Sequence, residues 1–76
     1  MKTYTPFGTI LRQLRQQRGL SQEALAARLD MSSNGYISRL ESNKKNPSLD
    51  MIFRIAEALN INGWEIVKLV EEKNQE

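Results

Sequence analysis

Residues 20–41 contain two short amphipathic helical patterns, joined by a polar segment at residues 30–34. In each pattern the apolar residues recur at helical spacing and form an inner face. They are Leu25, Ala26 and Leu29 in the first pattern, and Ile37 and Leu40 in the second. The outer face of the second pattern consists of small, polar or basic residues, namely Asn34, Gly35, Ser38, Arg39 and Ser42. Two helices at an angle, the second making contacts through its outer face, are typical of a helix-turn-helix, so this stretch predicts a unit that reads DNA.

The composition excludes several other classes of function. The 76 residues suffice for one small domain, which we expect to span residues 1–76. The sequence has no cysteine and no histidine, and it contains neither a Gly-rich phosphate loop nor a G-x-S-x-G elbow. We therefore expect no enzymatic activity, no metal and no cofactor. Since no apolar run approaches the roughly 18 residues of a membrane span and no signal peptide is recognisable, the expected location is the cytoplasm.

Charge is distributed unevenly along the chain. Residues 1–45 carry 8 Lys/Arg and 3 Asp/Glu, a net charge of +5, whereas residues 46–76 carry 3 Lys/Arg and 6 Asp/Glu, a net charge of −3. A basic front half suits a protein that approaches a polyanion from one side. Ordinary solvated charge explains the same distribution equally well, so charge alone does not decide the function.

Helical spacing and helix-end signals predict five helices and no strands. The first helix begins at Thr5, a candidate N-cap, and Pro6, which suits the first helical position. Ser21 and Ser48 are natural N-caps for the second and fourth helices. The predicted third helix covers about residues 34–42, with Ser32, Ser33 or Asn34 as its cap, and an Asn62–Glu65 capping box starts the fifth helix.

Two residues that tolerate the left-handed backbone conformation follow predicted helix ends, namely Gly19 and Asn43, and Asn60 ends the fourth helix. This fourth helix carries a wide apolar face made of Leu49, Ile52, Phe53, Ile55, Ala56 and Leu59. The spacing therefore predicts a bundle whose helices are bounded by short polar loops.

The sequence also resembles the Cro/C1-type (XRE-type) helix-turn-helix family of bacterial and phage regulators. The resemblance covers about residues 7–67 and lies in the stretches FGTILRQLRQQRGLSQEALAARL, YISRLES and NPSLDMIFRIAEALNI. It implies an all-α, five-helix, lambda-repressor-like domain, with the helix-turn-helix at about residues 21–42, that usually binds operator DNA as a dimer. Between Leu29 and Ile37 this chain has one residue more than the commonest family pattern, and the extra residue lies within residues 31–34.

By the same resemblance, Arg15 and Glu41 correspond to an ion pair that links the first helix to the end of the recognition helix. The alternative is two unrelated surface charges. Gln22, at the start of the second helix, corresponds to a contact with backbone phosphate, since free N–H groups at a helix start attract anions. The alternative for Gln22 is a solvated side chain.

Base contacts are expected from the recognition helix and the turn before it. Arg39 is the strongest candidate because a guanidinium pairs bidentately with guanine O6 and N7, although a phosphate contact or a solvated charge remains open. Asn34 suits adenine in the same way or serves as a cap. Tyr36 lies at the edge of the groove, where it touches a thymine methyl or a phosphate, or packs on the second helix. Gly35 has no side chain and permits close approach to the groove.

The turn and the loop after the recognition helix supply the remaining DNA candidates. We predict that Ser33 contacts a base and that Ser32 contacts a phosphate. The extra residue leaves open which of Ser32, Ser33 and Asn34 reaches a base. Lys44 and Lys45, with Asn43, follow the helix in a loop suited to phosphate contacts. Solvated lysines are the alternative.

The predicted C-terminal helix, about residues 63–73, is more apolar than one small core requires. We expect Trp64, Val67, Leu69 and Val70 to form a two-fold interface. The alternative is that they all pack on the first and fourth helices. The predicted function is sequence-specific binding of double-stranded DNA at a near-palindromic operator by a homodimeric transcriptional regulator, either a restriction-modification controller or a phage-type repressor. An antitoxin-type module that binds a partner protein is the alternative.

Overall fold

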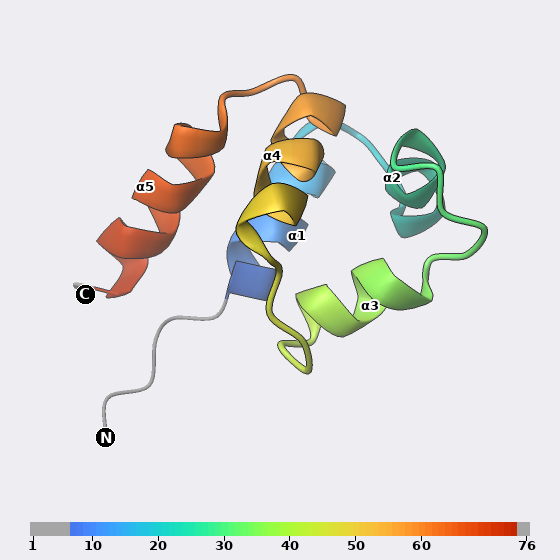
Figure 1. Ribbon diagram of the computed structural model, residues 1–76, viewed down its shortest axis with the longest axis horizontal. Coiled ribbons are helices and arrows are strands. Elements are labelled where there is room, and N and C mark those ends of the chain that lie inside the picture. The colour runs from blue at the N-terminus through green and yellow to red at the C-terminus, as the bar shows by residue number, and fades with distance from the viewer. Residues whose placement is uncertain (1–6, 75–76) are drawn as a thin grey trace.

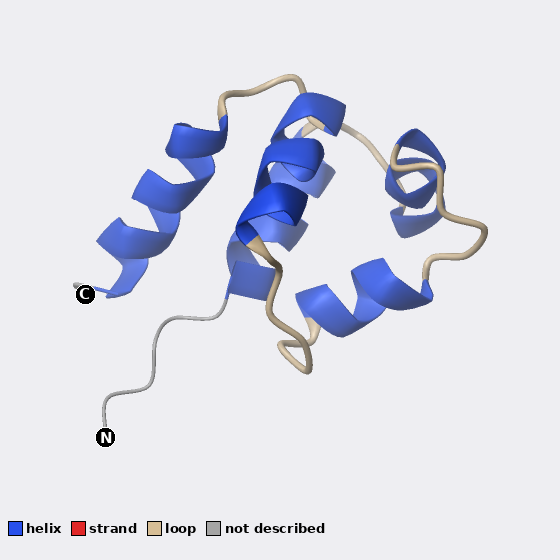
Figure 2. Cartoon of the chain, in the orientation of Figure 1, coloured by secondary structure: helices blue, strands red, loops and turns tan. Residues whose placement is uncertain are grey.

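Five α-helices make up residues 7–74, the part of the chain that the computed structural model describes. Figure 2 shows helices joined by loops, with no strand among these residues. The prediction of an all-α fold with five helices is confirmed. The predicted cap at Thr5 and Pro6 lies outside the described residues. The helices are α1 (Phe7–Gln17), α2 (Gln22–Arg28), α3 (Gly35–Glu41), α4 (Leu49–Ala58) and α5 (Gly63–Asn74).

One core joins the five helices. In Figure 1, α1 and α4 occupy the centre, α2 and α3 lie on one side of them, and α5 lies on the other. α1 contacts both α3 and α5, so it connects the two sides. The side chains with essentially no exposed surface come from all five helices or the residues that end them, namely Leu11, Leu25, Ile37, Leu40, Ile55, Leu59 and Ile66. Burial of this apolar set is the main force that holds the short helices together.

The predicted caps at the starts of the second, fourth and fifth helices agree with the structure. The Ser21 hydroxyl accepts a hydrogen bond from the Ala24 N–H at 3.0 Å, and the Ser48 hydroxyl accepts one from the Met51 N–H at 3.0 Å. At the start of α5 the Glu65 carboxylate accepts the Asn62 N–H at 2.8 Å. These contacts satisfy N–H groups that a helix start leaves unpaired.

Gly19 and Asn43, predicted to adopt the left-handed conformation, do so, with φ of 68° and 63°, and Asn60, predicted only to end the fourth helix, has a φ of 61°. Asp30 in the turn also has a positive φ, 59°, which the sequence did not single out. The third helix is one residue shorter at each end than expected, with Asn34 and Ser42 as its flanking cap residues.

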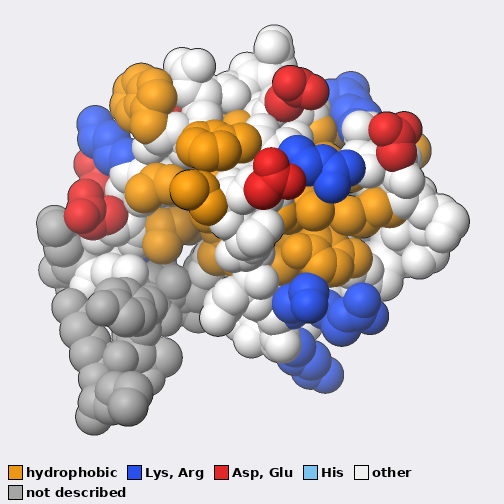
Figure 3. All heavy atoms as spheres, in the orientation of Figure 1, with side chains coloured by type: hydrophobic (Ala, Val, Ile, Leu, Met, Phe, Trp, Pro, Cys, Tyr) orange, Lys and Arg blue, Asp and Glu red, His pale blue; other side chains and the backbone are white. Residues whose placement is uncertain are grey.

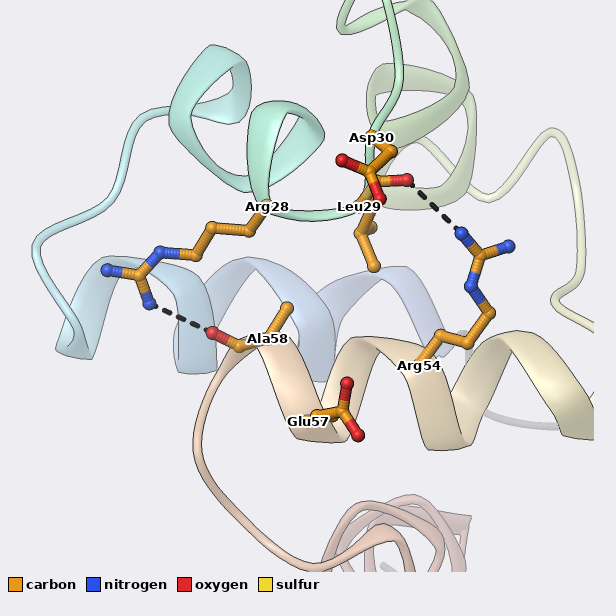
Figure 4. A pocket seen from close by; sticks show the side chains of 6 residues that line it. All are labelled: Arg28, Leu29, Asp30, Arg54, Glu57 and Ala58. Carbon is orange, nitrogen blue, oxygen red and sulfur yellow. Dashed lines mark hydrogen bonds between the residues drawn. The ribbon is translucent and has the colours of Figure 1, made fainter.

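Arginine side chains fasten α2 to α4 in a way that the sequence did not reveal. Figure 4 shows Arg28 reaching from α2 to the Ala58 carbonyl at 2.9 Å, and Arg54 reaching from α4 to the Leu29 carbonyl at 3.2 Å. Each guanidinium therefore caps the carboxyl end of the other helix, where the helix dipole favours a positive charge. Arg18 does the same at the Leu59 carbonyl, at 3.0 Å.

The wide apolar face predicted for α4 is only partly in the core. Ile55, Ala56 and Leu59 are buried, whereas Leu49 is 63% exposed and Phe53 is 53% exposed. Figure 3 shows hydrophobic side chains gathered over α4 and α5 on the face turned to the viewer. No helix within residues 7–74 is both long enough and apolar enough to span a membrane.

Candidate nucleic-acid interface

The third helix presents a buried face and an outer face, as its pattern predicts. Ile37 and Leu40 are completely buried against the core. On the opposite side Ser38, Arg39 and Ser42 are exposed. Figure 3 shows Lys and Arg side chains gathered at the lower edge of the molecule, where α3 and the loop after it lie in Figure 1. The arrangement leaves a helix with a polar, positively charged outer surface that is free of core contacts.

Arg15 and Glu41 form a buried ion pair between α1 and the end of α3. The Arg15 Nε lies 2.6 Å from Glu41 Oε2, and Arg15 Nη2 lies 3.0 Å from Oε1. This two-pronged geometry is the strongest that a guanidinium and a carboxylate make. Arg15 also donates to the Leu20 carbonyl at 2.7 Å. The pair therefore fixes the position of α3 relative to α1 and to the start of α2.

The environment keeps Glu41 ionised. Burial on its own raises the pKa of Glu41, but hydrogen bonds from Arg15 and Gln22 outweigh burial, and the pKa is lowered from its ordinary value of 4.5. The hydrogen bond to Glu41 raises the pKa of Arg15. A second guanidinium, that of Arg12, lies 3.5 Å from Glu41 Oε1 and is mostly exposed. Both partners therefore carry their full charges at neutral pH.

The Gln22 side chain contacts residues at both ends of the recognition helix. Its Nε2 donates to Glu41 Oε1 at 3.0 Å, and its Oε1 accepts from Asn34 Nδ2 at 3.0 Å. Asn34 Nδ2 also lies 3.2 Å from Glu23 Oε2. Both polar atoms of the Gln22 side chain are thus occupied within the molecule, at opposite ends of α3. Asn34 makes no side-chain cap to its own helix; its amide instead points back to α2.

These contacts change how two predicted DNA residues are understood. The Gln22 side chain, predicted to contact phosphate, and the Asn34 amide nitrogen, predicted to contact adenine, already have partners within the protein. The second N–H of Gln22 Nε2 and the Asn34 Oδ1 take no part in these hydrogen bonds. In this structure Gln22 and Asn34 position α3.

A further positioning contact lies at Gly8, which the sequence did not single out. The Gly8 N–H donates to Asn43 Oδ1 at 3.0 Å. A Cβ at position 8 would lie 2.2 Å from the Leu40 carbonyl oxygen and 2.7 Å from that of Glu41. Only glycine lets the start of α1 approach the end of α3 so closely. Asn43, predicted to contact phosphate, is exposed, but its side-chain oxygen anchors the loop to α1.

The remaining DNA candidates lie on the surface around α3. Ser32, Ser33, Lys44 and Lys45 are exposed, and Tyr36 is half-buried against the core. The Lys45 ammonium lies 5.6 Å from the centre of the Tyr36 ring, within range of a cation–π contact. The structure thus brings the predicted lysines to the same side of the molecule as the outer face of α3.

The predicted interface residues of α5 differ in exposure. Trp64 is 63% exposed, Val67 is 46% exposed and Leu69 is 37% exposed. Val70 is half-buried and packs against the core. Trp64 and Leu69 line one shallow hollow, and Val67 and Val70 line another together with Phe7 of α1. The four residues therefore do not form one flat patch.

Comparison with known proteins identifies the fold and its family. The Helix-turn-helix family model matches residues 11–63, well over half of the chain. The chain belongs to this family of helix-turn-helix regulators. The resemblance to Cro/C1-type proteins and the lambda-repressor-like form of the five-helix fold are confirmed. The chain is thus a DNA-binding transcriptional regulator, and its family is not enzymatic.

Three relatives illustrate the similarity. An uncharacterized HTH-type transcriptional regulator, y4dJ of Sinorhizobium fredii, is 34% identical over 65 residues, which cover 86% of this chain and 83% of the relative. The control protein C.MunI of a Mycoplasma species is 35% identical over 68 residues, 88% of this chain and 90% of that protein. The crystal structure of the restriction-modification controller protein C.AhdI from Aeromonas hydrophila matches this fold with a TM-score of 0.73, over 79% of this chain and 86% of that one. The two sequences are 40% identical.

Proposed function

We propose that this chain is a homodimeric, sequence-specific regulator that controls the genes of a restriction-modification system. The observation that carries the proposal is the polar and basic outer face of α3, with exposed Arg39 at its centre and Lys44 and Lys45 just beyond its end. The relative at 40% identity is a restriction-modification controller protein, the relative at 35% is a control protein, and each aligns over most of both chains. These likenesses favour a controller over a phage-type repressor.

In the proposed complex, α3 enters the major groove of double-stranded DNA. Arg39 donates to guanine O6 and N7, and Ser33 and Tyr36 approach neighbouring bases. Phosphate contacts from Ser32, Lys44 and Lys45 set the register of the protein on the duplex.

The buried network behind α3 makes this readout accurate. Arg15, Glu41 and Gln22 hold both ends of the helix to α1 and α2, so the angle of α3 is fixed before DNA arrives. A recognition element that is already rigid loses less conformational entropy on binding, which increases affinity.

The proposed homodimer uses the apolar face of α4 and α5, defined here as Leu49, Phe53, Trp64 and Val67. Each of these side chains is between 46% and 63% exposed. In a two-fold dimer the same face is buried on both subunits, and the recognition helices are set about one helical turn, roughly 34 Å, apart on a near-palindromic operator. Leu69 and Val70 are the other α5 residues of the proposed interface.

Selection from a random double-stranded DNA library with the full chain tests the proposal. We expect enrichment of a two-fold symmetric sequence, and sedimentation should give two chains on a duplex that holds one such site. Arg39→Ala should weaken the enrichment and remove the preference at one position in each half-site, whereas Lys68→Ala, which removes the same charge from α5, should preserve the enriched sequence. Failure to enrich any sequence would contradict the proposal. A monomer that co-purifies with a stoichiometric protein and binds DNA independently of Arg39 would instead favour the partner-binding alternative.

A further inference from the structure

A depression lies beside the recognition helix, between the turn and α3. Its volume is about 420 Å³. It is lined by Asp30, Met31, Ser32, Ser33, Gly35, Tyr36 and Arg39. Met31 and Gly35 have no role in the contacts described so far.

One side of the depression is apolar and held in place. Met31 and Tyr36 are half-buried and pack against the hydrophobic core, so their accessible surface is fixed by the fold. The Lys45 ammonium lies over the Tyr36 ring and further restricts it. A rigid apolar surface of this kind gains free energy by covering a small apolar group, because both surfaces leave water.

Gly35 leaves the space open. A Cβ at position 35 would meet the Arg39 Nη1 at 3.6 Å and the Ser33 Oγ at 3.7 Å, which are ordinary contact distances. No clash therefore requires glycine here, and φ at Gly35 is not positive. Gly35 is the first residue of α3, where glycine costs less than in a helix interior, and its missing methyl group leaves the depression open.

The charges at the depression select the kind of ligand. The Asp30 carboxylate repels a backbone phosphate, while the Arg39 guanidinium suits the acceptor atoms of guanine. An apolar wall beside a guanine-reading group fits a base edge that carries an apolar substituent. Among the four unmodified base pairs, only thymine presents such a group in the major groove, its C5-methyl.

We propose that this depression receives the C5-methyl group of a thymine next to the guanine that Arg39 contacts. The inference rests on the proposed DNA-binding function and names a base that this surface specifies. The Met31 and Tyr36 side chains make the contact, and Gly35 provides room for it. The apolar contact made by these side chains therefore adds base specificity to that of the hydrogen bonds from Arg39.

Uracil substitution tests the assignment, because uracil differs from thymine only by this methyl group. The probe is the duplex most enriched from the random library, with each thymine replaced in turn by deoxyuridine. Burial of one methyl group corresponds to roughly a fourfold change in affinity. We expect about a fourfold loss of affinity at one thymine position in each half-site. This thymine should lie next to the guanine that Arg39 contacts, which is the position where Arg39→Ala no longer distinguishes between bases. An unchanged affinity at every position would overturn the assignment.

Gly35→Ala is the decisive variant, since it adds a methyl group to the lining of the depression at ordinary contact distances from Arg39 and Ser33. It should bind the thymine and uracil duplexes equally, with an unfolding temperature at or above that of the original chain. Ser38→Ala, on the same outer face but outside the depression, should keep the fourfold ratio whatever its overall affinity. A Gly35→Ala protein that keeps the ratio would refute the proposal. If no duplex is enriched at all, the DNA-binding proposal itself fails, which is a distinguishable result.

Discussion

Glu41→Gln should cause a large loss of stability, because it leaves the buried Arg15 guanidinium without its counter-charge. The Glu41 side chain is completely buried, and that of Arg15 is only 11% exposed. Breaking such a pair by removing one partner costs about 3–5 kcal/mol. The lower end applies here, since Arg15 keeps its hydrogen bond to the Leu20 carbonyl. A chain of this size has a free energy of unfolding of only about 4–11 kcal/mol, so the loss is a large share of the total.

Urea unfolding followed by far-ultraviolet circular dichroism measures this loss at pH 7. We expect a lower midpoint with an unchanged dependence on urea concentration, and an unfolding temperature lower by roughly 12–24 °C. Glu57→Gln, which removes the same charge from an exposed position on α4, is the control and should change little. A loss below about 1 kcal/mol for Glu41→Gln would refute the view that the pair fixes α3.

The same residue makes stability depend on acid. The pKa of Glu41 is lower in the folded state than its ordinary value of 4.5, which we take for the unfolded chain. Between these two pKa values the unfolded state binds more protons, so the free energy of unfolding rises with pH there. The contribution of Glu41 is complete above pH 4.5 and is lost as pH falls through the folded pKa. Glu41→Gln should therefore flatten this part of the acid-unfolding curve, and an unchanged curve would contradict the assignment.

Three further predictions concern the contacts around this pair and the exposed apolar face. Gly8→Ala should destabilise the fold by about 1–3 kcal/mol in urea unfolding, because its Cβ would clash with backbone oxygens of α3; a neutral result would show that α1 can shift away freely. Arg54→Met should cost about 1 kcal/mol by removing the cap on the Leu29 carbonyl, and hydrogen exchange at the end of α2 should speed up; equal exchange in both proteins would argue against a capping role. Trp64→Asp should give a monomer with an unchanged helix content, as judged by sedimentation and circular dichroism, and a persistent dimer would place the interface elsewhere.

Helix ends were predictable because they depend on neighbouring residues. Ser21 and Ser48 accept hydrogen bonds from N–H groups three residues on. Gly19 and Asn43 adopt the left-handed conformation that glycine and asparagine tolerate after a helix. Such signals are local, so sequence alone shows them.

The contacts that aim the recognition helix were harder to predict. The sequence did not reveal that the Gln22 amide joins Glu41 to Asn34 within the protein, and its phosphate contact stays a prediction. Gly8 gave no signal, because its closeness to Leu40 arises only when α1 and α3 pack together. Such roles depend on the relative placement of segments far apart in the chain, which spacing and propensity do not encode. Family resemblance supplied the Arg15–Glu41 correspondence for the same reason: the pairing is a property of the fold.

The outer face of α3 is central to the account, and Arg39→Ala tests it most directly. Equilibrium binding would be measured for the selected duplex and for duplexes changed at each position, over a series of salt concentrations. We predict that log affinity falls steeply with log salt, as expected when lysines and arginines displace counterions. Arg39→Ala should cost about 1–3 kcal/mol and relax the preference at one position in each half-site. A flat salt dependence, or a uniform loss across all sequences, would contradict base reading by α3.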